Sequence, residues 1–217
     1  MNNLDNKFKV FGRKKGRRKK INFDKDLFKI YEFTENSNLK NKKLILDIGF
    51  GFGENTIHLA KQHPNKIIIA SDVFEDGTMH LIESINQNYL KNVKILNQNV
   101  YILFDKMNLE VCFEEIWLLF PDPWPKNRHY KRRLINSNFL KKIAHYLKQD
   151  GKLHIATDST NYFVSILESI AESKVFEWIN FKGKEWNYLN YNLPLTKFCI
   201  KALKANKTPK YMILTKI

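Results

Sequence analysis

The sequence predicts an α/β fold of the doubly wound class, built on a mostly parallel sheet. From position 43 onward, apolar runs of four to six residues alternate with amphipathic segments of 9 to 14 residues, the pattern of strands alternating with helices. A glycine-rich turn follows the first run, where a strand is expected to pass into its helix. The run Glu115–Phe120 is as apolar as a strand buried on both faces.

Seven runs predict the strands. They are expected at residues 44–48, 66–70, 93–96, 115–120, 152–157, 176–181 and 211–216. Isoleucine, leucine and valine are prominent in the first five runs, as in buried parallel strands. The last two runs predict a final strand pair.

Four segments between these runs predict helices. They span residues 54–62, 78–89, 135–148 and 161–173. The third ends at the turn Gln149–Gly151, whose glycine interrupts the chain before the next strand. The sequence shows no internal repeat and no second domain, so residues 21–217 are expected to form one domain.

Composition limits the function classes. A hydrophobic fraction of 43% in 217 residues predicts a globular chain, and no apolar run approaches the roughly 20 residues that span a bilayer. The first residues are polar and basic, which does not resemble a secretory signal. Cys112 and Cys199 are too few for a disulfide framework or a thiolate metal site, and the six histidines lack metal-ligand spacing. We expect a cytoplasmic protein without a metal.

The formal charge of +15 predicts a polyanionic partner. Nucleic acid is favoured over a membrane surface, because no basic segment has a clean apolar face. Residues 1–20 form a basic arm with few apolar side chains, expected to be flexible when free and to contact phosphates when bound. A solubilising tail is the alternative interpretation of this arm.

An acidic, glycine-rich turn marks the expected end of the first strand. Asp47 stands at the strand end, and Gly49, Gly51 and Gly53 follow at alternate positions. Glycines allow a close approach of the backbone to a ligand, and the helix start beyond offers free N–H groups. Nineteen residues after Gly53, Asp72 ends the second strand, where a carboxylate can bind both ribose hydroxyls of an adenosine.

The glycine spacing distinguishes between cofactors. The pattern G-x-G-x-G is one residue shorter than the dinucleotide fingerprint G-x-G-x-x-G. A carboxylate at Asp47 suits a cofactor with a cationic amino-acid tail and would repel a pyrophosphate. S-adenosylmethionine (SAM) is therefore expected rather than NAD.

A proline-framed loop follows the fourth strand. Pro121, Pro123 and Pro125 forbid helix and ladder, so Asp122 and Trp124 between them are held in a stiff, extended frame. Ligands of open α/β sheets bind just beyond such strand ends. The next residues form a cationic segment, Lys126, Arg128, His129, Lys131, Arg132 and Arg133. We interpret the loop as an active-site loop beside a phosphate-binding patch; a proline turn with a solvated basic helix start is the alternative.

These motifs resemble those of the bacterial tRNA (guanine-N7-)-methyltransferase family. The likeness covers the turn 47–53, Asp72, the loop with its basic segment, residues 156–158 and residues 195–198. It also includes the basic stretch 11–17 of the arm. The loop with its basic segment is close to diagnostic, whereas the glycine turn is shared by SAM-dependent methyltransferases generally.

The resemblance implies a Rossmann-like class I methyltransferase sheet of seven strands with the last strand antiparallel. It implies methylation of N7 of guanosine 46 in the variable loop of tRNA. It places on the cofactor side Asp47, the three glycines, Asp72, Asn99 and Asp122. It places on the substrate side Lys126, Asp158, Thr196, Lys197, Phe198 and Cys199, and in contact with RNA Arg128, His129, Tyr130, Lys131, Arg132 and Arg133.

Three positions depart from the family pattern. Asp47 and Asn99 stand where the family commonly has Glu and Asp, and both side chains permit the same contacts. Cys199 stands where the motif Thr-x-Phe normally ends in Glu, which removes a carboxylate from the implied substrate pocket.

Asp122 is the expected catalytic residue. It would hold the guanine through N1–H and the exocyclic amine and offset the cation that develops on the base. Trp124 either stacks on a base or packs the loop, and Lys126 meets a phosphate or is a surface lysine.

Two other methyltransferase-fold functions compete with this one. An enzyme acting on an exocyclic amine is disfavoured because Trp124 follows a single proline after Asp122. A non-catalytic RNA-binding protein would lack SAM affinity, against the intact cofactor acids. No obligatory protein partner is expected, and a monomer or a homodimer is equally compatible with the sequence.

Overall fold

The computed structural model describes residues 11, 12, 14, 15, 22–34, 39, 41–107 and 112–217. The chain separates into two compact units, residues 1–111 and residues 112–217. Most of the predicted flexible arm, 1–20, lies outside the described residues. The arm and the single domain over 21–217 therefore stay predictions.

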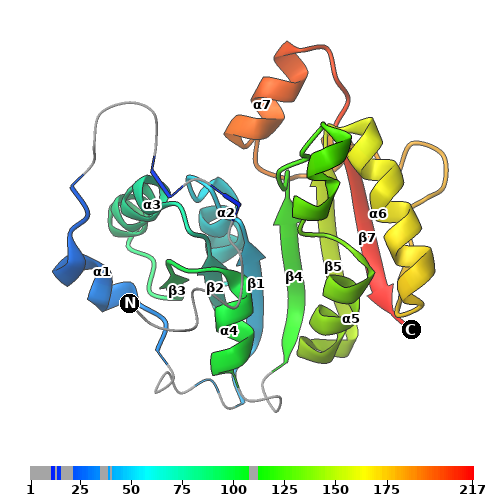
Figure 1. Ribbon diagram of the computed structural model, residues 1–217. Coiled ribbons are helices and arrows are strands. Elements are labelled where there is room, and N and C mark those ends of the chain that lie inside the picture. Colours follow the sequence, from blue (N-terminus) through cyan, green and yellow to red (C-terminus); the bar gives the residue numbers. More distant parts are fainter. Residues whose placement is uncertain (1–10, 13, 16–21, 35–38, 40, 108–111) are drawn as a thin grey trace. The chain divides into compact units, whose positions relative to one another are not determined.

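The first unit is a three-stranded parallel sheet with helices (Figure 1). Its elements are α1 (Lys25–Tyr31), β1 (Leu44–Ile48), α2 (Glu54–Gln62), β2 (Ile67–Ser71), α3 (Glu75–Gln87), β3 (Val93–Leu96) and α4 (Val100–Lys106). The order is β3-β2-β1, with Leu44 opposite Ile67 and Ile68 opposite Val93. All five residues of β1 are buried, four of them apolar and the fifth the acid Asp47.

The second unit is a four-stranded mixed sheet. Its elements are β4 (Phe113–Leu119), the 3-10 helix η1 (Asn127–Arg132), α5 (Ser137–Tyr146), β5 (Leu147–Thr157), α6 (Thr160–Ser173), β6 (Phe176–Trp178), the 3-10 helix η2 (Tyr188–Asn190), α7 (Lys197–Lys204) and β7 (Lys210–Lys216). The order is β4-β5-β7-β6, and α5 and α6 pack against each other and against β5.

The last strand, β7, runs antiparallel to both of its neighbours. Leu153 of β5 faces Leu214, and Phe176 of β6 faces Lys216. Within the described residues the strands number seven. The predicted α/β class, the seven strands and the antiparallel last strand are confirmed.

Several predicted boundaries shift. The helix expected at 78–89 begins at Glu75, so Gly77 lies inside it. The turn expected at 149–151 is part of β5, where the register against β4 shifts between Phe113 and Glu115. The strand expected at 176–181 ends at Trp178. Beyond it, the Ile213 N–H donates to the side-chain oxygen of Asn180 at 2.7 Å and not to a strand carbonyl.

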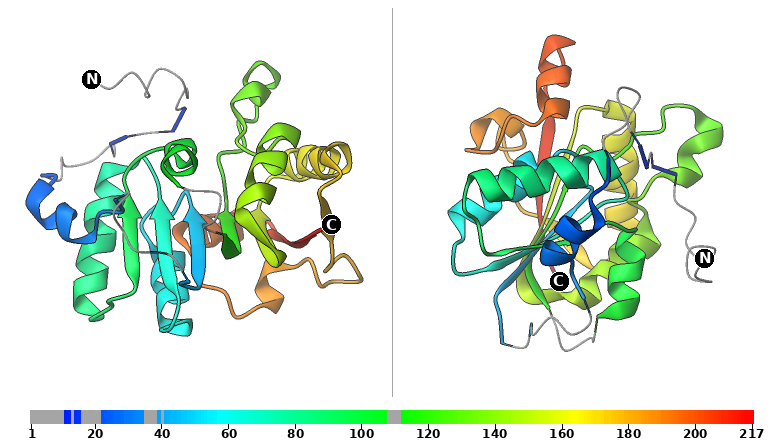
Figure 2. Two further views of the ribbon diagram at one scale, coloured as in Figure 1. Left: turned by 90° about the horizontal axis from the view of Figure 1, so that it is seen from below. Right: turned by 90° about the vertical axis from the view of Figure 1, so that its left-hand side faces the viewer.

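Three α-helices were not predicted. No side chain of α1 is buried, and α4 has only seven residues, so neither gives a strong periodic signal. Helix α7 begins where the Thr196 hydroxyl accepts from the Cys199 N–H at 3.1 Å, a side-chain N-cap. It projects beyond the strands of the second unit (Figures 1 and 2).

The core of the second unit contains an aromatic stack across β4, β5 and β7. The rings of Trp117 and His154 lie 3.8 Å apart at 9°, and the imidazole Nδ1 lies 2.6 Å from the Tyr211 hydroxyl. The Trp117 indole donates to Glu115 at 3.1 Å. Burial lowers the pKa of His154 and raises the pKa of Tyr211. The stack is therefore a neutral, packed part of the core.

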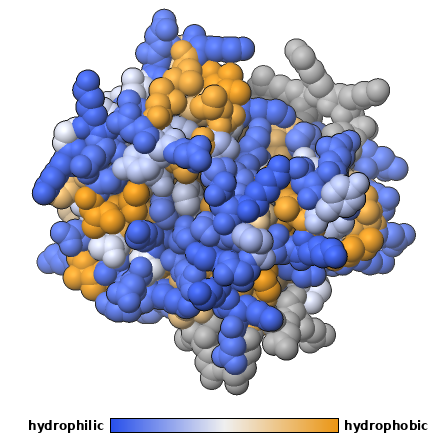
Figure 3. Space-filling view, turned by 180° about the vertical axis from the view of Figure 1, so that it is seen from behind, coloured by the Kyte–Doolittle hydropathy of each residue, from blue (hydrophilic) through white to orange (hydrophobic). Residues whose placement is uncertain are grey.

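The surface is largely hydrophilic on the face drawn in Figure 3, with separate apolar patches. Exposed apolar side chains of the second unit include Leu195 and Phe198, which are 56% and 51% exposed. Across the described parts of the chain, every helix is too short or too polar to span a bilayer.

Candidate functional site

The glycine turn after β1 adopts left-handed backbone at each glycine. The φ angles are 73° at Gly49, 59° at Gly51 and 90° at Gly53, a region that residues with a side chain rarely adopt. The Gly49 N–H donates to the Ser71 carbonyl at 2.7 Å, which ties the turn to the end of β2. A Cβ built at Gly49 would meet nothing within 4 Å. The exposed side of this turn thus has room for a ligand.

Asp47 anchors the turn from beneath. Its carboxylate accepts from the Asn55 amide at 3.1 Å and from the Thr56 hydroxyl at 2.7 Å, which joins the end of β1 to the first turn of α2. The side chain is 2% exposed. Burial raises the pKa of Asp47 to about 6, although both donated hydrogen bonds lower it. Burial therefore disfavours the charged form of the Asp47 carboxylate.

Asp72 follows β2 directly and reaches the same turn. One carboxylate oxygen accepts from the Gly51 N–H at 2.8 Å and the other from the Phe74 N–H at 3.1 Å. The Asn97 amide donates to the Asp72 carbonyl at 3.0 Å. The sequence predicted an acid at this strand end, and the structure brings it onto the glycine turn.

Asn99 lies one strand further along. It caps α4, where its side-chain oxygen accepts from the Tyr101 N–H at 3.0 Å. Strands β1, β2 and β3 are parallel, so Asp47, Asp72 and Asn99 all lie at the carboxyl edge of one sheet. The predicted cofactor residues of the first unit are therefore gathered in one region.

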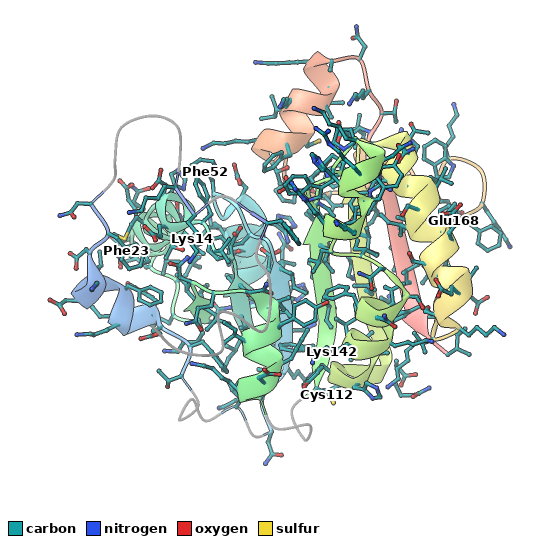
Figure 4. All side chains as sticks on the ribbon, viewed as in Figure 1. Lys14, Phe23, Phe52, Cys112, Lys142 and Glu168 are labelled. Carbon is teal, nitrogen blue, oxygen red and sulfur yellow. The ribbon has the colours of Figure 1, made fainter. Side chains whose placement is uncertain are left out.

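Helix α3 packs against the turn at a position that the sequence did not single out. A Cβ at Gly77 would lie 1.9 Å from the Gly51 carbonyl oxygen, so only glycine fits. The ring of Phe52 meets Phe74 edge-on at 5.2 Å, and Figure 4 shows Phe52 and Lys14 beside α3. Gly77 precedes the helix expected at 78–89, so the predicted pattern did not mark it as a helical glycine.

Lys14 and Lys15 are the described lysines of the basic arm. The Lys14 carbonyl accepts from the Glu75 N–H at 2.9 Å, and the Lys15 ammonium lies 3.4 Å from the Glu75 carboxylate. Both contacts are at the first turn of α3.

The proline loop leaves β4 through strained backbone. Phe120 has φ 55° and Trp124 has φ 43°, each costing roughly 1–3 kcal/mol for a residue with a side chain. The Phe120 N–H still donates to the Ala156 carbonyl at 2.8 Å, and its ring packs on Tyr188 at 5.5 Å. Asp122 between them is exposed. The loop thus presents the predicted catalytic carboxylate to solvent on a fixed frame.

Arg133 is buried, which departs from the RNA contact implied for it. It is 5% exposed, and its guanidinium lies 3.7 Å from the Tyr130 ring centroid and 4.9 Å from that of Tyr162. Its Nε donates to the Pro123 carbonyl at 2.9 Å, and one terminal nitrogen donates to the Asn161 side chain at 2.5 Å. Arg133 therefore fastens the proline loop to the start of α6.

Three other residues of the basic segment face outward. Lys126, Arg128 and Lys131 are exposed, and η1 stands out from the strands of the second unit (Figure 2). The Arg132 guanidinium lies 5.0 Å over the Trp124 ring, whose edge also meets His129 at 5.8 Å. Trp124 is thus packed within its own loop by the Arg132 guanidinium and the His129 ring.

The predicted substrate residues after β5 occupy two places. Asp158 follows β5 and pairs with Lys207 at 3.0 Å. Thr196 and Cys199 are buried at the start of α7, where burial raises the pKa of the thiol, whereas Lys197 and Phe198 are exposed. In this arrangement Thr196 acts as a cap and the Cys199 thiol is enclosed. Nowhere in the described ranges do three or more His, Cys, Asp or Glu side chains gather as a metal site would require.

Comparison with known proteins identifies relatives. A family model described as "Putative methyltransferase" matches residues 41–212. A tRNA (guanine-N(7)-)-methyltransferase of Nitrosomonas eutropha is 37% identical over 172 residues, 79% of this chain and 75% of the relative. One from Neorickettsia sennetsu is 35% identical over 174 residues, 78% of this chain and 80% of the relative.

Other relatives are longer. A bifunctional methyltransferase of Rickettsia conorii is 35% identical over 175 residues, which are 81% of this chain and 33% of that protein. The chain therefore corresponds to about one third of the length of such relatives.

Solved structures show the fold. An rRNA methylase from Streptococcus thermophilus superposes with a TM-score of 0.55 at 15% identity, covering 88% of this chain and 92% of the other. A SAM-dependent O-methyltransferase from Thermotoga maritima gives 0.54 at 19% identity, covering 93% and 68%. The chain has the Rossmann-like class I methyltransferase fold and belongs to the tRNA (guanine-N(7)-)-methyltransferase family.

Proposed function

We propose that the protein transfers a methyl group from SAM to N7 of guanosine 46 in the variable loop of tRNA. One observation carries this proposal beyond the family likeness. The proline loop holds an exposed carboxylate, Asp122, on a frame fastened by Arg133, and exposed basic residues follow it directly. Asp122 can accept hydrogen bonds from a base, and the basic residues beside it can bind the phosphates of the RNA that carries that base.

The first unit is assigned to the cofactor. SAM would be held by the turn at Gly49, Gly51 and Gly53, with Asp72 toward the ribose and Asn99 toward the adenine. The room above Gly49 and the gathering of the acids at one sheet edge fit a group that carries a cationic tail and a ribose. When bound, SAM supplies an electrophilic methyl group on sulfur.

The second unit is assigned to the base. Guanine N7 already carries an in-plane lone pair and no proton, so its attack on the methyl group needs no general base. Orientation alone can contribute about 7 kcal/mol or more. Asp122 would accept hydrogen bonds from N1–H and the exocyclic amine of guanine, and its charge would offset the cation that forms on the base.

The surface beside Asp122 is assigned to the tRNA backbone. Lys126, Arg128 and Lys131 are exposed and would meet phosphates, while His129, Tyr130 and Arg132 support the segment. The exposed Lys197 and Phe198 and the carboxylate of Asp158 remain substrate-side proposals. A cytoplasmic location follows from a tRNA substrate.

The decisive experiment incubates the protein with SAM and an unmodified tRNA transcript and then analyses nucleosides by mass spectrometry. N7-methylguanosine is expected, and it should vanish when guanosine 46 is replaced. Methylation of a different base would refute the substrate assignment, and absence of methylation despite SAM binding would refute the enzyme assignment.

Asp122→Ala tests the catalytic assignment in the same assay. The carboxylate is exposed, so the variant should fold while turnover falls by about a hundredfold, the usual range for losing a group that stabilises developing charge. Asp150→Ala, an exposed acid in β5, is the matched control. Near-normal turnover of folded Asp122→Ala would contradict its role.

A further inference from the structure

The second unit contains a polar pocket whose lysines and indole no sequence motif had singled out. Its volume is about 290 Å³, and it lies between the start of α6 and the start of β7. The lining consists of Asp158, Ser159, Thr160, Trp186, Lys207, Thr208 and Lys210. The volume is at the small end for ligand pockets, roughly 300 Å³, and suits one nucleotide unit rather than a larger cofactor.

The pocket carries a net positive charge. Lys207 lies 3.0 Å from the Asp158 carboxylate, so these two charges offset each other. Lys210 faces the Thr160 hydroxyl at 3.3 Å and the ring of Phe163 at 5.7 Å, neither of which is an anion. One ammonium charge thus remains for an incoming anion, and a phosphate could also draw Lys207 from its partially exposed acid.

The remaining lining adds the other features of a nucleotide site. Ser159, Thr160 and Thr208 contribute hydroxyl groups, which can donate to phosphate oxygens. Trp186 contributes a half-buried indole, and its backbone carbonyl accepts from the Tyr211 N–H at 2.6 Å. An indole ring is a platform on which any base or ribose can pack.

We propose that this pocket binds one nucleotide of the tRNA outside the methylated guanosine, with Lys207 and Lys210 on its phosphate and Trp186 against its base or ribose. The proposal rests on the proposed tRNA substrate and adds a second point of attachment. The pocket opens beyond the carboxyl end of β5, where ligands of α/β sheets bind. It would fix the register of the RNA while the basic segment 126–132 supplies general attraction.

The experiment measures the dissociation constant of tRNA over a range of salt concentrations. In the double variant Lys207→Met, Lys210→Met, tRNA binding should weaken by about tenfold at moderate salt. The slope of log affinity against log salt should shrink by about 1 to 2, one for each lost phosphate contact. Lys201→Met, Lys204→Met on α7 is the matched control, because both lysines are exposed and neither lines the pocket.

Two further variants keep the proposal testable if the double variant misfolds. Lys207→Met removes one ammonium whose side chain is 53% exposed and should lower the salt slope by about 1. Trp186→Leu should weaken tRNA binding about tenfold with no change in the slope, and Trp186→Phe should restore most of the affinity.

The outcomes separate the pocket from the enzyme assignment. Equal affinity and equal salt slope in the pocket and control variants would overturn the proposal. Binding of guanosine monophosphate or inorganic phosphate with the same dependence on Lys207, but no effect of that lysine on tRNA, would also overturn it. A wild-type protein that binds tRNA through this pocket but forms no N7-methylguanosine would refute the proposed reaction and leave the pocket supported.

Discussion

Arg132 and Arg133 are adjacent in sequence yet sit in different environments. Arg132 is partly exposed over Trp124, whereas Arg133 is enclosed between Tyr130 and Tyr162 and bonded to the Pro123 carbonyl. Stacking of a desolvated guanidinium on aromatic rings contributes about 2 kcal/mol. The two arginines of one basic segment therefore have different roles. Arg132 lies at the surface over Trp124, and Arg133 holds the proline loop in place.

Arg133→Lys separates these roles. Lysine keeps the charge but cannot reproduce the planar fork or the stacking, so the Asp122 loop should loosen. We expect methylation at saturating tRNA and SAM to fall by about tenfold, while the dissociation constant for tRNA stays within about twofold. Steady-state kinetics and filter binding provide the two numbers, with a thermal melt to check folding.

Lys201→Arg on α7 is the control for that variant. It also exchanges one cation for another, is exposed, lies outside the basic segment, and should change neither value appreciably. If Arg133→Lys left turnover at the wild-type level, or if it weakened tRNA binding in step with turnover, the positioning role would be wrong.

Asp47 predicts a pH dependence of stability. Its pKa of about 6 lies above the roughly 3.9 expected in the unfolded chain, so the folded state binds more protons between these values. The contribution of Asp47 to the free energy of unfolding should therefore fall as pH rises from about 4 to about 6. Asp47→Asn lacks this titration, so its stability relative to wild type should increase over the same interval.

Denaturant unfolding at several pH values measures this difference. Asp150→Asn, an exposed acid, serves as the reference substitution. A stability difference between wild type and Asp47→Asn that is constant from pH about 4 to about 7 would contradict the buried charge.

At the scale of elements, the glycine turn packs closely against α3. The Gly51 carbonyl oxygen lies 1.9 Å from the place of a Cβ on Gly77, and the Leu81 side chain of the same helix lies 2.6 Å from the place of a Cβ on Gly53. The turn therefore depends on the absence of side chains both in its own segment and in the helix behind it.

Gly77→Ala tests this dependence. In an open helix, alanine would stabilise by about 1 kcal/mol relative to glycine. Here the added methyl group would sit 1.9 Å from a backbone oxygen, and forced overpacking costs about 1–3 kcal/mol or more. We expect a lower melting temperature and weaker SAM binding, measured by calorimetry.

Glu83→Ala, on the exposed face of α3, supplies the comparison. A Gly77→Ala variant as stable as wild type, with unchanged SAM affinity, would show that the turn accommodates the methyl group.

The sequence was most informative where burial is continuous. Strand β1 has four apolar residues in five and is fully buried, and its predicted bounds are those observed. Helix α1 buries nothing, and α7 buries only Cys199 and Ala202, so neither carries an apolar stripe wide enough to be recognised. Apolar sequence patterns reflect burial, so helices and strands that bury few side chains cannot be predicted from them.

The site was predicted in its chemistry and less in its packing. Asp72 could be placed on the glycine turn from strand position alone, because parallel strands end at a common edge. Burial of Arg133 could not be predicted, since its partners Tyr162 and Asn161 lie almost thirty residues further along the chain. Lys207 and Lys210 likewise reach Asp158 and Thr160 only through the tertiary fold.

For the whole molecule, charge is the dominant property. With a formal charge of +15, association with RNA should be strongly salt-dependent. If the exposed Lys126, Arg128 and Lys131 each meet a phosphate, tRNA affinity should fall by about 40-fold to about 130-fold between about 50 mM and about 300 mM salt. Fluorescence anisotropy with labelled tRNA measures the slope, and an affinity independent of salt would remove the electrostatic basis of RNA binding.

The division into two compact units also has an optical consequence. All four tryptophans, at positions 117, 124, 178 and 186, lie in residues 112–217, and residues 1–111 have none. Tryptophan emission therefore reports on the second unit alone, whereas far-ultraviolet circular dichroism reports helices and strands in both. Superimposable denaturation curves from the two signals would indicate cooperative unfolding of one domain. Different midpoints would indicate that the first unit unfolds separately, in a transition that tryptophan fluorescence does not detect.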